Sequence, residues 1–440
     1  MTEAPMLVAE LTAEGEGGPE SIRGYAAELL VPKWFSKDPS TSVEEDRGAL
    51  VEAARDAFAA VRRHAEAEGG ATAFDLWLHA QHTCVEGPNV PAGERLVRTF
   101  GVALVERALI DAACRAAGVS FFRALRDDLF GVRMERIDSR LAGWSATDLG
   151  RRIEETRVRH TVGLVDALVP EEVPADQRGD DDHPLSLVDD VRAYGLDCFK
   201  VKVSGNALAD LHRLRRIGEL TPAGSQFTLD GNEQYDDPAG LADLLDDLEA
   251  EGGAEELLGG LIAIEQPVHR ARTFEDATRD GVARLAERAP VIIDEADADL
   301  SAYPRARSLG YGGVSMKACK GPFRALVARA RIQADGEGLQ SAEDLTNLPA
   351  LPLHQDLALV SALGLPNVER NGHHYFRGQD HLASEEREHL LRHHPDLYAA
   401  DGRLVVEGGR LSLASLDVPG FGYAGPVDAL AGARVEEVLA

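Results

Sequence analysis

Residues 198–202 read Cys-Phe-Lys-Val-Lys, a short apolar run that ends in a charged residue. From about residue 160 to residue 371, such runs alternate with segments of helical pattern, and every run from the second onward ends in a polar or charged residue. From Lys202 on, successive run ends lie 23 to 35 residues apart, about one strand plus one helix each. The eight runs are Thr161–Leu168, Cys198–Lys202, Gln226–Asp230, Leu261–Glu265, Val291–Asp294, Val314–Lys317, Gly338–Glu343 and Asn367–Asn371.

Between the runs, apolar residues recur at helical spacing, as at Leu208, Leu211, Leu214 and Ile217. Eight strand-plus-helix units predict an α/β fold of the (β/α)₈ TIM-type barrel class. In that fold the active site lies where the C-terminal ends of the strands meet. A doubly wound sheet is the structural alternative, but the chain has no Gly-x-Gly-x-x-Gly turn after an early strand and no phosphate-binding loop.

The flanking parts of the chain differ from the barrel in pattern. Gly24–Val31 is a short apolar run, a loop bounded by prolines follows it, and helical patterns cover Ser42–Ala67 and Ala92–Ala117. The chain turns polar again after the eighth run, and its last part predicts a return to the N-terminal unit. We therefore expect an N-terminal α+β domain, a barrel that starts with an irregular stretch over residues 136–160, and a C-terminal segment. Their ranges are 1–135, 136–378 and 379–440.

The composition limits the partners and the location of the protein. A net charge of −29 disfavours nucleic acid and anionic membranes as partners, because binding phosphate needs a basic face. No uncharged apolar run approaches the roughly 20 residues of a membrane helix, and the acidic N-terminus does not resemble a secretory signal. Four scattered cysteines fit free thiols in a reducing compartment. We expect a cytoplasmic enzyme with a small-molecule substrate, and a homo-oligomer is compatible with this composition.

Lysine is rare in this chain. Only six of the 46 basic residues are lysines, so arginine supplies nearly all of the positive surface charge. A lysine can lose its proton when its pKa is lowered, whereas an arginine stays charged. The lysines are therefore candidates for work that arginine cannot do, and four of them form two close pairs. The six are Lys33, Lys37, Lys200, Lys202, Lys317 and Lys320.

Runs three, four and five end in Asp230, Glu265 and Asp294. In a barrel these ends are neighbours, and buried like charges repel one another unless a cation neutralises them. A hard divalent ion fits, with Mg²⁺ the first choice and Mn²⁺ the next, whereas zinc would call for histidine or cysteine. One such acid alone would more often cap a helix or pair with an arginine. Three at consecutive strand ends predict a metal site.

Lysines are expected on both sides of these acids. Lys200 and Lys202 share one face of strand two, and adjacent ammonium groups lower each other's pKa, which makes one of them a usable base. Strand six ends in Lys317. Strands two and six flank the acidic strands, so Lys202 and Lys317 should face each other across the metal. That arrangement places one proton-transfer group on each side of an anionic intermediate.

Taken together, these motifs resemble the enolase superfamily, in its muconate lactonizing enzyme-like subgroup, over nearly the whole chain. The motifs are Phe199-Lys200-Val201-Lys202, Leu229-Asp230-Gly231-Asn232, Ile264-Glu265-Gln266-Pro267, Ile293-Asp294-Glu295, Met316-Lys317-Ala318-Cys319-Lys320 and Pro419-Gly420-Phe421-Gly422. The resemblance implies Mg²⁺ held by the three acids, with Lys202 and Lys317 as the acid/base pair. It places Lys200 at the carboxylate-binding end and Asn232 beside the metal. It also implies that the N-terminal and C-terminal parts form an α+β capping domain whose loops close over the barrel mouth.

Strand seven departs from the mandelate racemase-like branch of the family. That branch would show a histidine-based group there, whereas this strand reads Gln340-Ser341-Ala342-Glu343-Asp344, so a lysine/lysine pair fits better. Glu343 at this strand end is a candidate contact to the substrate.

Several other candidates have two readings. His373, a candidate substrate contact, and His374 follow strand eight, and for either one a structural histidine fits as well as a pocket residue. Lys33, Trp34 and Lys37 lie on the proline-bounded loop, where they would either meet a distal substrate group or face solvent. The role of Lys320 is left open.

The residues and the resemblance together predict a Mg²⁺-dependent isomerase or lyase that removes the α-proton of a small carboxylate substrate and forms an enediolate. Two lysines acting on opposite faces would give racemisation or epimerisation. One base with an assisting lysine would give dehydration or cycloisomerisation, and the sequence does not choose between these outcomes. There are two alternatives. One is a Schiff-base aldolase with Lys317 as nucleophile, which has no need of the three acids. The other is a non-catalytic binding barrel, which needs neither the acids nor the lysines.

Overall fold

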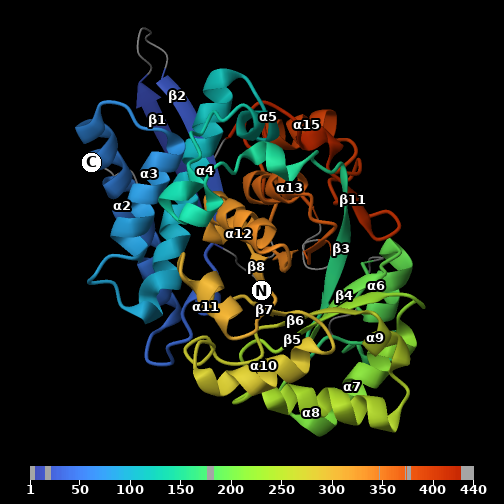
Figure 1. Ribbon diagram of the computed structural model, residues 1–440. Coiled ribbons are helices and arrows are strands. Elements are labelled where there is room, and N and C mark those ends of the chain that lie inside the picture. The colour runs from blue at the N-terminus through green and yellow to red at the C-terminus, as the bar shows by residue number, and fades with distance from the viewer. Residues whose placement is uncertain are drawn as a thin grey trace.

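Eight parallel strands form the centre of the molecule (Figure 1). The structure, a computed structural model, describes residues 5–14, 21–175, 183–345, 347–371, 373 and 378–427. The strand order is β10-β3-β4-β5-β6-β7-β8-β9, and β9 lies next to β10, so the sheet curls round on itself as a barrel. The strands are β3 (Glu155–Val162), β4 (Cys198–Lys202), β5 (Gln226–Asp230), β6 (Leu261–Glu265), β7 (Val291–Ile293), β8 (Gly313–Met316), β9 (Leu339–Ala342) and β10 (Asn367–Glu369).

The barrel predicted from the sequence is confirmed, and seven of its strands lie within two residues of the predicted runs. Their register brings the charged ends level with one another. Lys202 lies opposite Asp230, and Asp230 lies opposite Glu265. Glu265 in turn lies opposite Ile292, two residues before Asp294. The acidic strand ends therefore meet at one mouth of the barrel.

The first predicted strand is misplaced. The prediction put it at Thr161–Leu168, whereas β3 spans Glu155–Val162 and so lies mostly in the stretch expected to be irregular. Arg159 and Thr161 bond to carboxylates of other strand ends, so the true strand does not read as an apolar run. The apolar residues that suggested a strand lie partly in solvent, and Val165 is 95% exposed.

Helices cover the outer face of the barrel, and in Figure 1 α7, α8 and α10 lie along its lower side. In α7, Leu211, Leu214 and Ile217 are buried, and each contributes roughly 1.5–3 kcal/mol of apolar burial. Leu208 is exposed, so the buried face begins one turn later than the pattern predicts. The outer helices are α6 (Leu187–Tyr194), α7 (Ala207–Leu220), α8 (Pro238–Glu251), α9 (Glu255–Gly259), α10 (Arg279–Ala286), α11 (Ala302–Ser308), α12 (Pro322–Asp335) and α13 (Leu351–Leu363).

The N-terminal domain packs an antiparallel pair of strands against long helices. Both long helical patterns are confirmed, and Ser42 and Glu45 form a capping box at the start of the first helix. The predicted start at residue 92 is a short 3₁₀ turn that leads into the second. The elements are β1 (Met6–Glu14), β2 (Ser21–Leu29), α1 (Pro32–Phe35), α2 (Val43–Glu68), α3 (Ala73–Ala80), α4 (Arg95–Ala117) and α5 (Phe121–Arg126).

Gly24 allows β2 to lie directly against α4. A Cβ atom at this position would come within 2.1 Å of the carbonyl oxygen of Ala108. We expect Gly24→Ala to lower the free energy of unfolding by about 1–3 kcal/mol, because the strand or the helix must move to accept the methyl group.

A denaturant titration measures this loss. Gly48→Ala is the matched control, because Gly48 lies in α2 with nothing within 4 Å of its added Cβ, so stability should stay the same or rise by up to about 1 kcal/mol. Equal stability of the two variants would contradict the close contact between β2 and α4.

The C-terminal segment contacts both other parts of the chain. After α15 (Ser384–His393), β11 (Arg410–Ser412) pairs antiparallel with β3 of the barrel. The backbone N–H of Phe421 donates to Asp111 Oδ1 of α4 at 2.8 Å, and the Phe421 ring lies 4.2 Å from that of Phe121. The segment thus reaches the N-terminal domain, while the exact domain boundaries stay a prediction. Among the described residues, no helix has the length and apolar character needed to cross a membrane.

Candidate active site

The charged side chains predicted at the strand ends converge at the barrel mouth. All are buried except Lys202, whose side chain is 22% exposed and is therefore the most accessible of the group. This brings together the predicted acid/base and metal residues and Glu343. The converging residues are Lys200, Lys202, Asp230, Glu265, Asp294, Lys317 and Glu343.

Lys200 is the central cation of this cluster. Its Nζ lies 2.8 Å from Glu343, 2.9 Å from Glu265, 3.0 Å from Glu369 and 3.1 Å from Asp230. Burial alone would lower the pKa of Lys200, but the surrounding carboxylates outweigh it and hold the pKa well above its usual range. Lys200 is thus a fixed positive charge. Glu369, one of its four partners, was not predicted from the sequence.

Lys202 differs from the prediction in its protonation. Burial and the neighbouring charge of Lys200 both lower its pKa, the second as expected, but Asp230 is directly bonded to it and the net pKa is raised. In this structure Lys202 is therefore a paired ammonium group. The prediction considered the two lysines without the carboxylate of Asp230, and that carboxylate reverses the direction of the pKa shift of Lys202.

Lys317 lies on the opposite side of the acids. Its Nζ donates to both carboxylate oxygens of Asp294 at 3.0 Å and also to Glu343. Lys320 stands behind it and donates to the carbonyl oxygens of Asp294 and Ser315, both at 2.8 Å. Lys320 therefore holds the Asp294 loop in place, a role that its spacing from Lys317 did not reveal.

The acids fit a hard divalent cation. Glu265, Asp294 and Glu343 each offer an oxygen within 4.8 Å of the others. Burial and the nearby carboxylates, Glu343 above all, raise the pKa of Glu265 well above its usual range, which is the strain that a bound cation would relieve. Asp230, the third predicted ligand, turns toward the lysines instead. The structure thus groups two predicted ligands with Glu343, which had been assigned to the substrate.

Two side chains around these acids shape the site. Asn232, with φ of 44°, donates its side-chain amide to Glu295 at 2.9 Å, and its backbone N–H donates to Asp230 at 2.7 Å. It therefore lies beside the acids, and its place beside a metal stays a prediction. Gln266 accepts the backbone N–H of Asp294 at 2.9 Å. Gln266 therefore fixes the turn that carries Asp294, which its place in the motif alone could not show.

The proline-bounded loop lies over the mouth of the barrel. Lys33 is structural, because it pairs with Asp46 at 2.6 Å. The Trp34 ring lies 5.2 Å from Lys317 Nζ and 5.8 Å from Lys320 Nζ, close enough for cation–π contact. The Trp34 ring thus covers the Lys317 side of the site.

A clamp between barrel and loop holds Trp34 there. The guanidinium of Arg270 donates to the carbonyl oxygens of Trp34 and Phe35 at 3.1 and 3.0 Å and forks onto Glu233 at 2.8 and 2.9 Å. Lys37 also bonds to Glu233. A cleft of about 960 Å³ opens beside the loop, with Lys37 and Arg270 in its lining. No sequence signal distinguished Arg270 from the other arginines.

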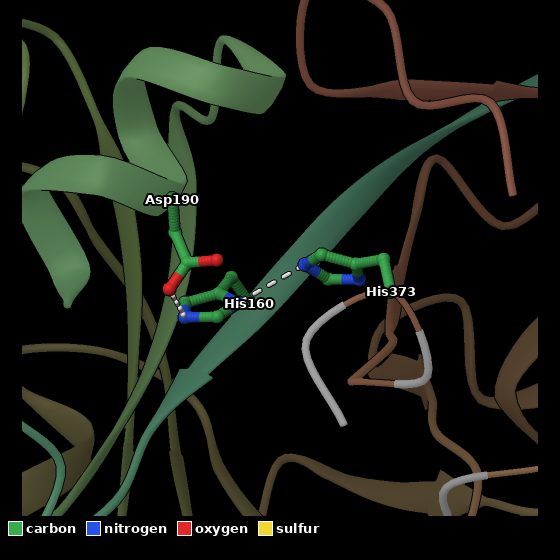
Figure 2. Close-up of side chains that lie close together, drawn as sticks. All are labelled: His160, Asp190 and His373. Atoms are coloured by element: carbon green, nitrogen blue, oxygen red, sulfur yellow. Dashed lines mark hydrogen bonds and ion pairs between the residues drawn. The ribbon is translucent and has the colours of Figure 1, made fainter. Parts of the chain in front are cut away.

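His373 lies apart from this cluster. It contacts His160 on the other side of β3, and Asp190 lies next to His160, as Figure 2 shows. His374 lies outside the described residues. The substrate role predicted for His373 is therefore not supported by contact with the converging residues.

Comparisons with known proteins give the fold. No family model matches the chain, and no curated protein matches it. Many solved structures match this chain, and three of them illustrate the similarity, which extends over nearly their whole length. The L-Ala-D/L-Glu epimerase of Bacillus subtilis has 16% identity and a TM-score of 0.56, with 96% of this chain and 91% of that chain covered. A mandelate racemase/muconate lactonizing enzyme of Roseiflexus sp. has 18% identity and a TM-score of 0.57, with 96% of this chain and 98% of that chain covered. The dipeptide epimerase of Enterococcus faecalis has 12% identity and a TM-score of 0.53, with 95% of this chain and 98% of that chain covered. The barrel with its capping domain is thus the fold of these enzymes, as the sequence resemblance implies.

Proposed function

We propose that this protein is a member of the enolase superfamily, of the muconate lactonizing enzyme-like subgroup, that abstracts the α-proton of a small carboxylate substrate. The observation that carries the proposal is the placement of Lys202 and Lys317 on β4 and after β8, with the three acidic strand ends between them. A fold shared at 12–18% identity would not by itself supply a reaction.

The chain's own residues divide the work. The acids Asp230, Glu265 and Asp294 would hold Mg²⁺, or Mn²⁺, which when bound supplies positive charge for the substrate carboxylate and for the enediolate. Lys200, fixed by four carboxylates, adds charge at the carboxylate end. Lys202 and Lys317 then take and return the proton at the α-carbon, and Trp34 excludes water on the Lys317 side.

Racemisation or epimerisation is the outcome that the geometry favours. Both lysines lie at strand ends, one on each side of the acids, and both are bonded to carboxylates of the site. Two proton-transfer groups on opposite sides suit inversion at one carbon. A lyase would need only one of them as the base.

The Schiff-base alternative is disfavoured by the surroundings of Lys317. Its Nζ donates to Asp294, one of the proposed metal ligands, and to Glu343. A Schiff-base enzyme has no need of a metal or of the acids that would hold it.

Exchange of the substrate's α-proton with solvent tests the proposal. A panel of hydroxy acids, N-acyl amino acids and dipeptides would be incubated with the Mg²⁺-loaded protein in heavy water and followed by NMR. We expect deuterium at the α-carbon of the inverted product for at least one class. A folded, Mg²⁺-loaded protein that exchanges no α-proton across the panel would count against the function. A borohydride-trapped adduct on Lys317 would favour the aldolase instead.

A further inference from the structure

Three side chains with metal-binding atoms meet on the outer side of β3 (Figure 2). His160 lies on β3, Asp190 on α6, and His373 follows β10. Successive side chains of a strand point to opposite faces, and Arg159, next to His160, bonds to Glu343 inside the barrel. His160 therefore points away from the candidate active site, toward α6. The cluster is separate from the acids that the proposed function uses.

The two imidazoles already have the spacing of two ligands on one ion. His160 Nδ1 lies 3.2 Å from His373 Nε2. Two nitrogen ligands bound tetrahedrally at about 2.0–2.1 Å from zinc are roughly 3.3 Å apart. One ligand atom from each of the three residues lies within 4.8 Å of the other two, so the carboxylate of Asp190 needs to approach by on the order of 1–1.5 Å.

The burial of these ligand atoms and their chemical type together favour one class of metal ion. His160 is 3% exposed, Asp190 is fully buried, and His373 is 5% exposed. His160 Nε2 lies 3.7 Å from Asp190 Oδ2, which is too long for a hydrogen bond between these two groups. Two imidazoles and one carboxylate suit zinc or a similar borderline ion, whereas Mg²⁺ prefers oxygen ligands alone.

The surroundings hold the ligands in place. The hydroxyl of Tyr194, in the same helix as Asp190, donates to the carbonyl oxygen of His373 at 3.2 Å, and its ring packs edge-on against the His373 ring at 4.8 Å. Such contacts fix the orientation of a histidine ligand. Nearby, β10 pairs with β3 over only three residues, Asn367–Glu369. An ion bound here would strengthen a short junction of the barrel.

We propose that His160, Asp190 and His373 form a second metal site that takes Zn²⁺, with water in a fourth position, and fastens the chain after β10 to β3 and α6. This site is independent of the proposed reaction. The acidic site is chemically suited to Mg²⁺ and this one to Zn²⁺, so one protein sample would bind both ions at once.

Zinc uptake in the presence of excess Mg²⁺ tests the proposal on the full chain. The protein would be stripped with a chelator, saturated with Mg²⁺, titrated with Zn²⁺ by calorimetry and then dialysed for metal analysis. We expect one tightly held zinc per chain and an X-ray absorption spectrum with two imidazoles and oxygen near 2.0 Å. His373→Gln and Asp190→Asn should each weaken zinc binding by roughly 100-fold or more, because even the loss of a residue that only supports a ligand costs about 10–100-fold.

Two variants complete the test. His212→Gln, which changes an exposed histidine of α7, should bind zinc like the unchanged protein. Asp294→Asn should keep the zinc and lose only Mg²⁺. Zinc that disappears in Asp294→Asn but survives in His373→Gln would lie in the barrel centre and would overturn the proposal.

A hydrogen-bonded imidazole pair is the other outcome. In that case the unchanged protein would retain no zinc after dialysis, and Co²⁺ added in its place would give no absorption bands of a tetrahedral site. These two measurements need no variant, so a substitution that prevents folding cannot obscure the answer.

Discussion

Replacing Lys202 with arginine should abolish net turnover and leave a folded protein. Arginine keeps the positive charge beside Asp230, so the ion pair that closes this end of β4 survives. It cannot give up a proton near neutral pH, so it cannot serve as a base. Loss of a positioned proton-transfer group costs about 10²–10⁴-fold in rate, and we expect a fall in kcat of that size.

The proton exchange of the two substrate enantiomers makes this prediction sharper. In Lys202→Arg, the enantiomer whose α-proton faces Lys202 should no longer exchange it with heavy water. The opposite enantiomer should still exchange through Lys317, and Lys317→Arg should show the reverse pattern. Lys33→Arg is the matched control, because Lys33 pairs with Asp46 at the domain surface and should not affect exchange. Near-normal turnover in Lys202→Arg would rule out a lysine base at this position.

The barrel could be predicted because its strands carry their signal locally. Each run from β4 to β10 is short, apolar and ends in a polar residue, and a helical pattern separates it from the next. β3 lacked this signal, since its inward side chains Arg159 and Thr161 are polar and meet charges from distant strands. A strand whose inner face is polar does not differ from a loop in hydropathy alone.

The positions of the candidate site residues could be predicted, but their pairings could not. The acids and lysines stand at the ends of predicted strands, which indicates that they meet at the same mouth of the barrel. Which lysine bonds to which acid depends on side-chain length and on strand register across the barrel. Lys202 shows the consequence, because its pKa is raised by Asp230 although its neighbour Lys200 lowers it.

Other contacts depend on segments that are far apart in the chain. The clamp of Arg270 on Trp34 joins residues 236 positions apart, and His160 meets His373 across 213 positions. No periodicity links such residues, and neither histidine lies in a spaced metal motif. Only the fold brings them together.

Lysines balance the negative charge of the acids in the barrel mouth. Glu343 illustrates the balance, because burial would raise its pKa, yet Lys200 and Lys317 outweigh burial and keep the pKa well below its usual range. Asp294 is similar, with a pKa lowered to about 2 by Lys317 and Lys320 against the effect of burial. Both groups are therefore ionised at neutral pH.

Replacing Asp294 with asparagine should weaken Mg²⁺ binding by about 100-fold or more. The amide keeps the shape of the side chain but removes its charge, and hard cations depend on carboxylate charge for affinity. Calorimetric titration of chelator-stripped protein measures the dissociation constant. Asp276→Asn, at a carboxylate that is 93% exposed, should bind Mg²⁺ normally. Unchanged binding in Asp294→Asn would remove this residue from the metal site.

The same titration decides which acid is the third ligand. Asp230 is expected from its strand position beside Glu265, whereas the structure groups Glu343 with Glu265 and Asp294. Glu343 is already bonded to Lys200 and Lys317, and Arg159 Nη2 lies 3.2 Å from it, so moving it to an ion would leave three buried cations short of a partner. Asp230 has to release Lys202, whose side chain is partly exposed and can be solvated, and Lys200, which keeps its contacts to Glu265 and Glu369. We therefore expect Asp230→Asn to weaken Mg²⁺ binding far more than Glu343→Gln does, and the opposite order would make Glu343 the ligand.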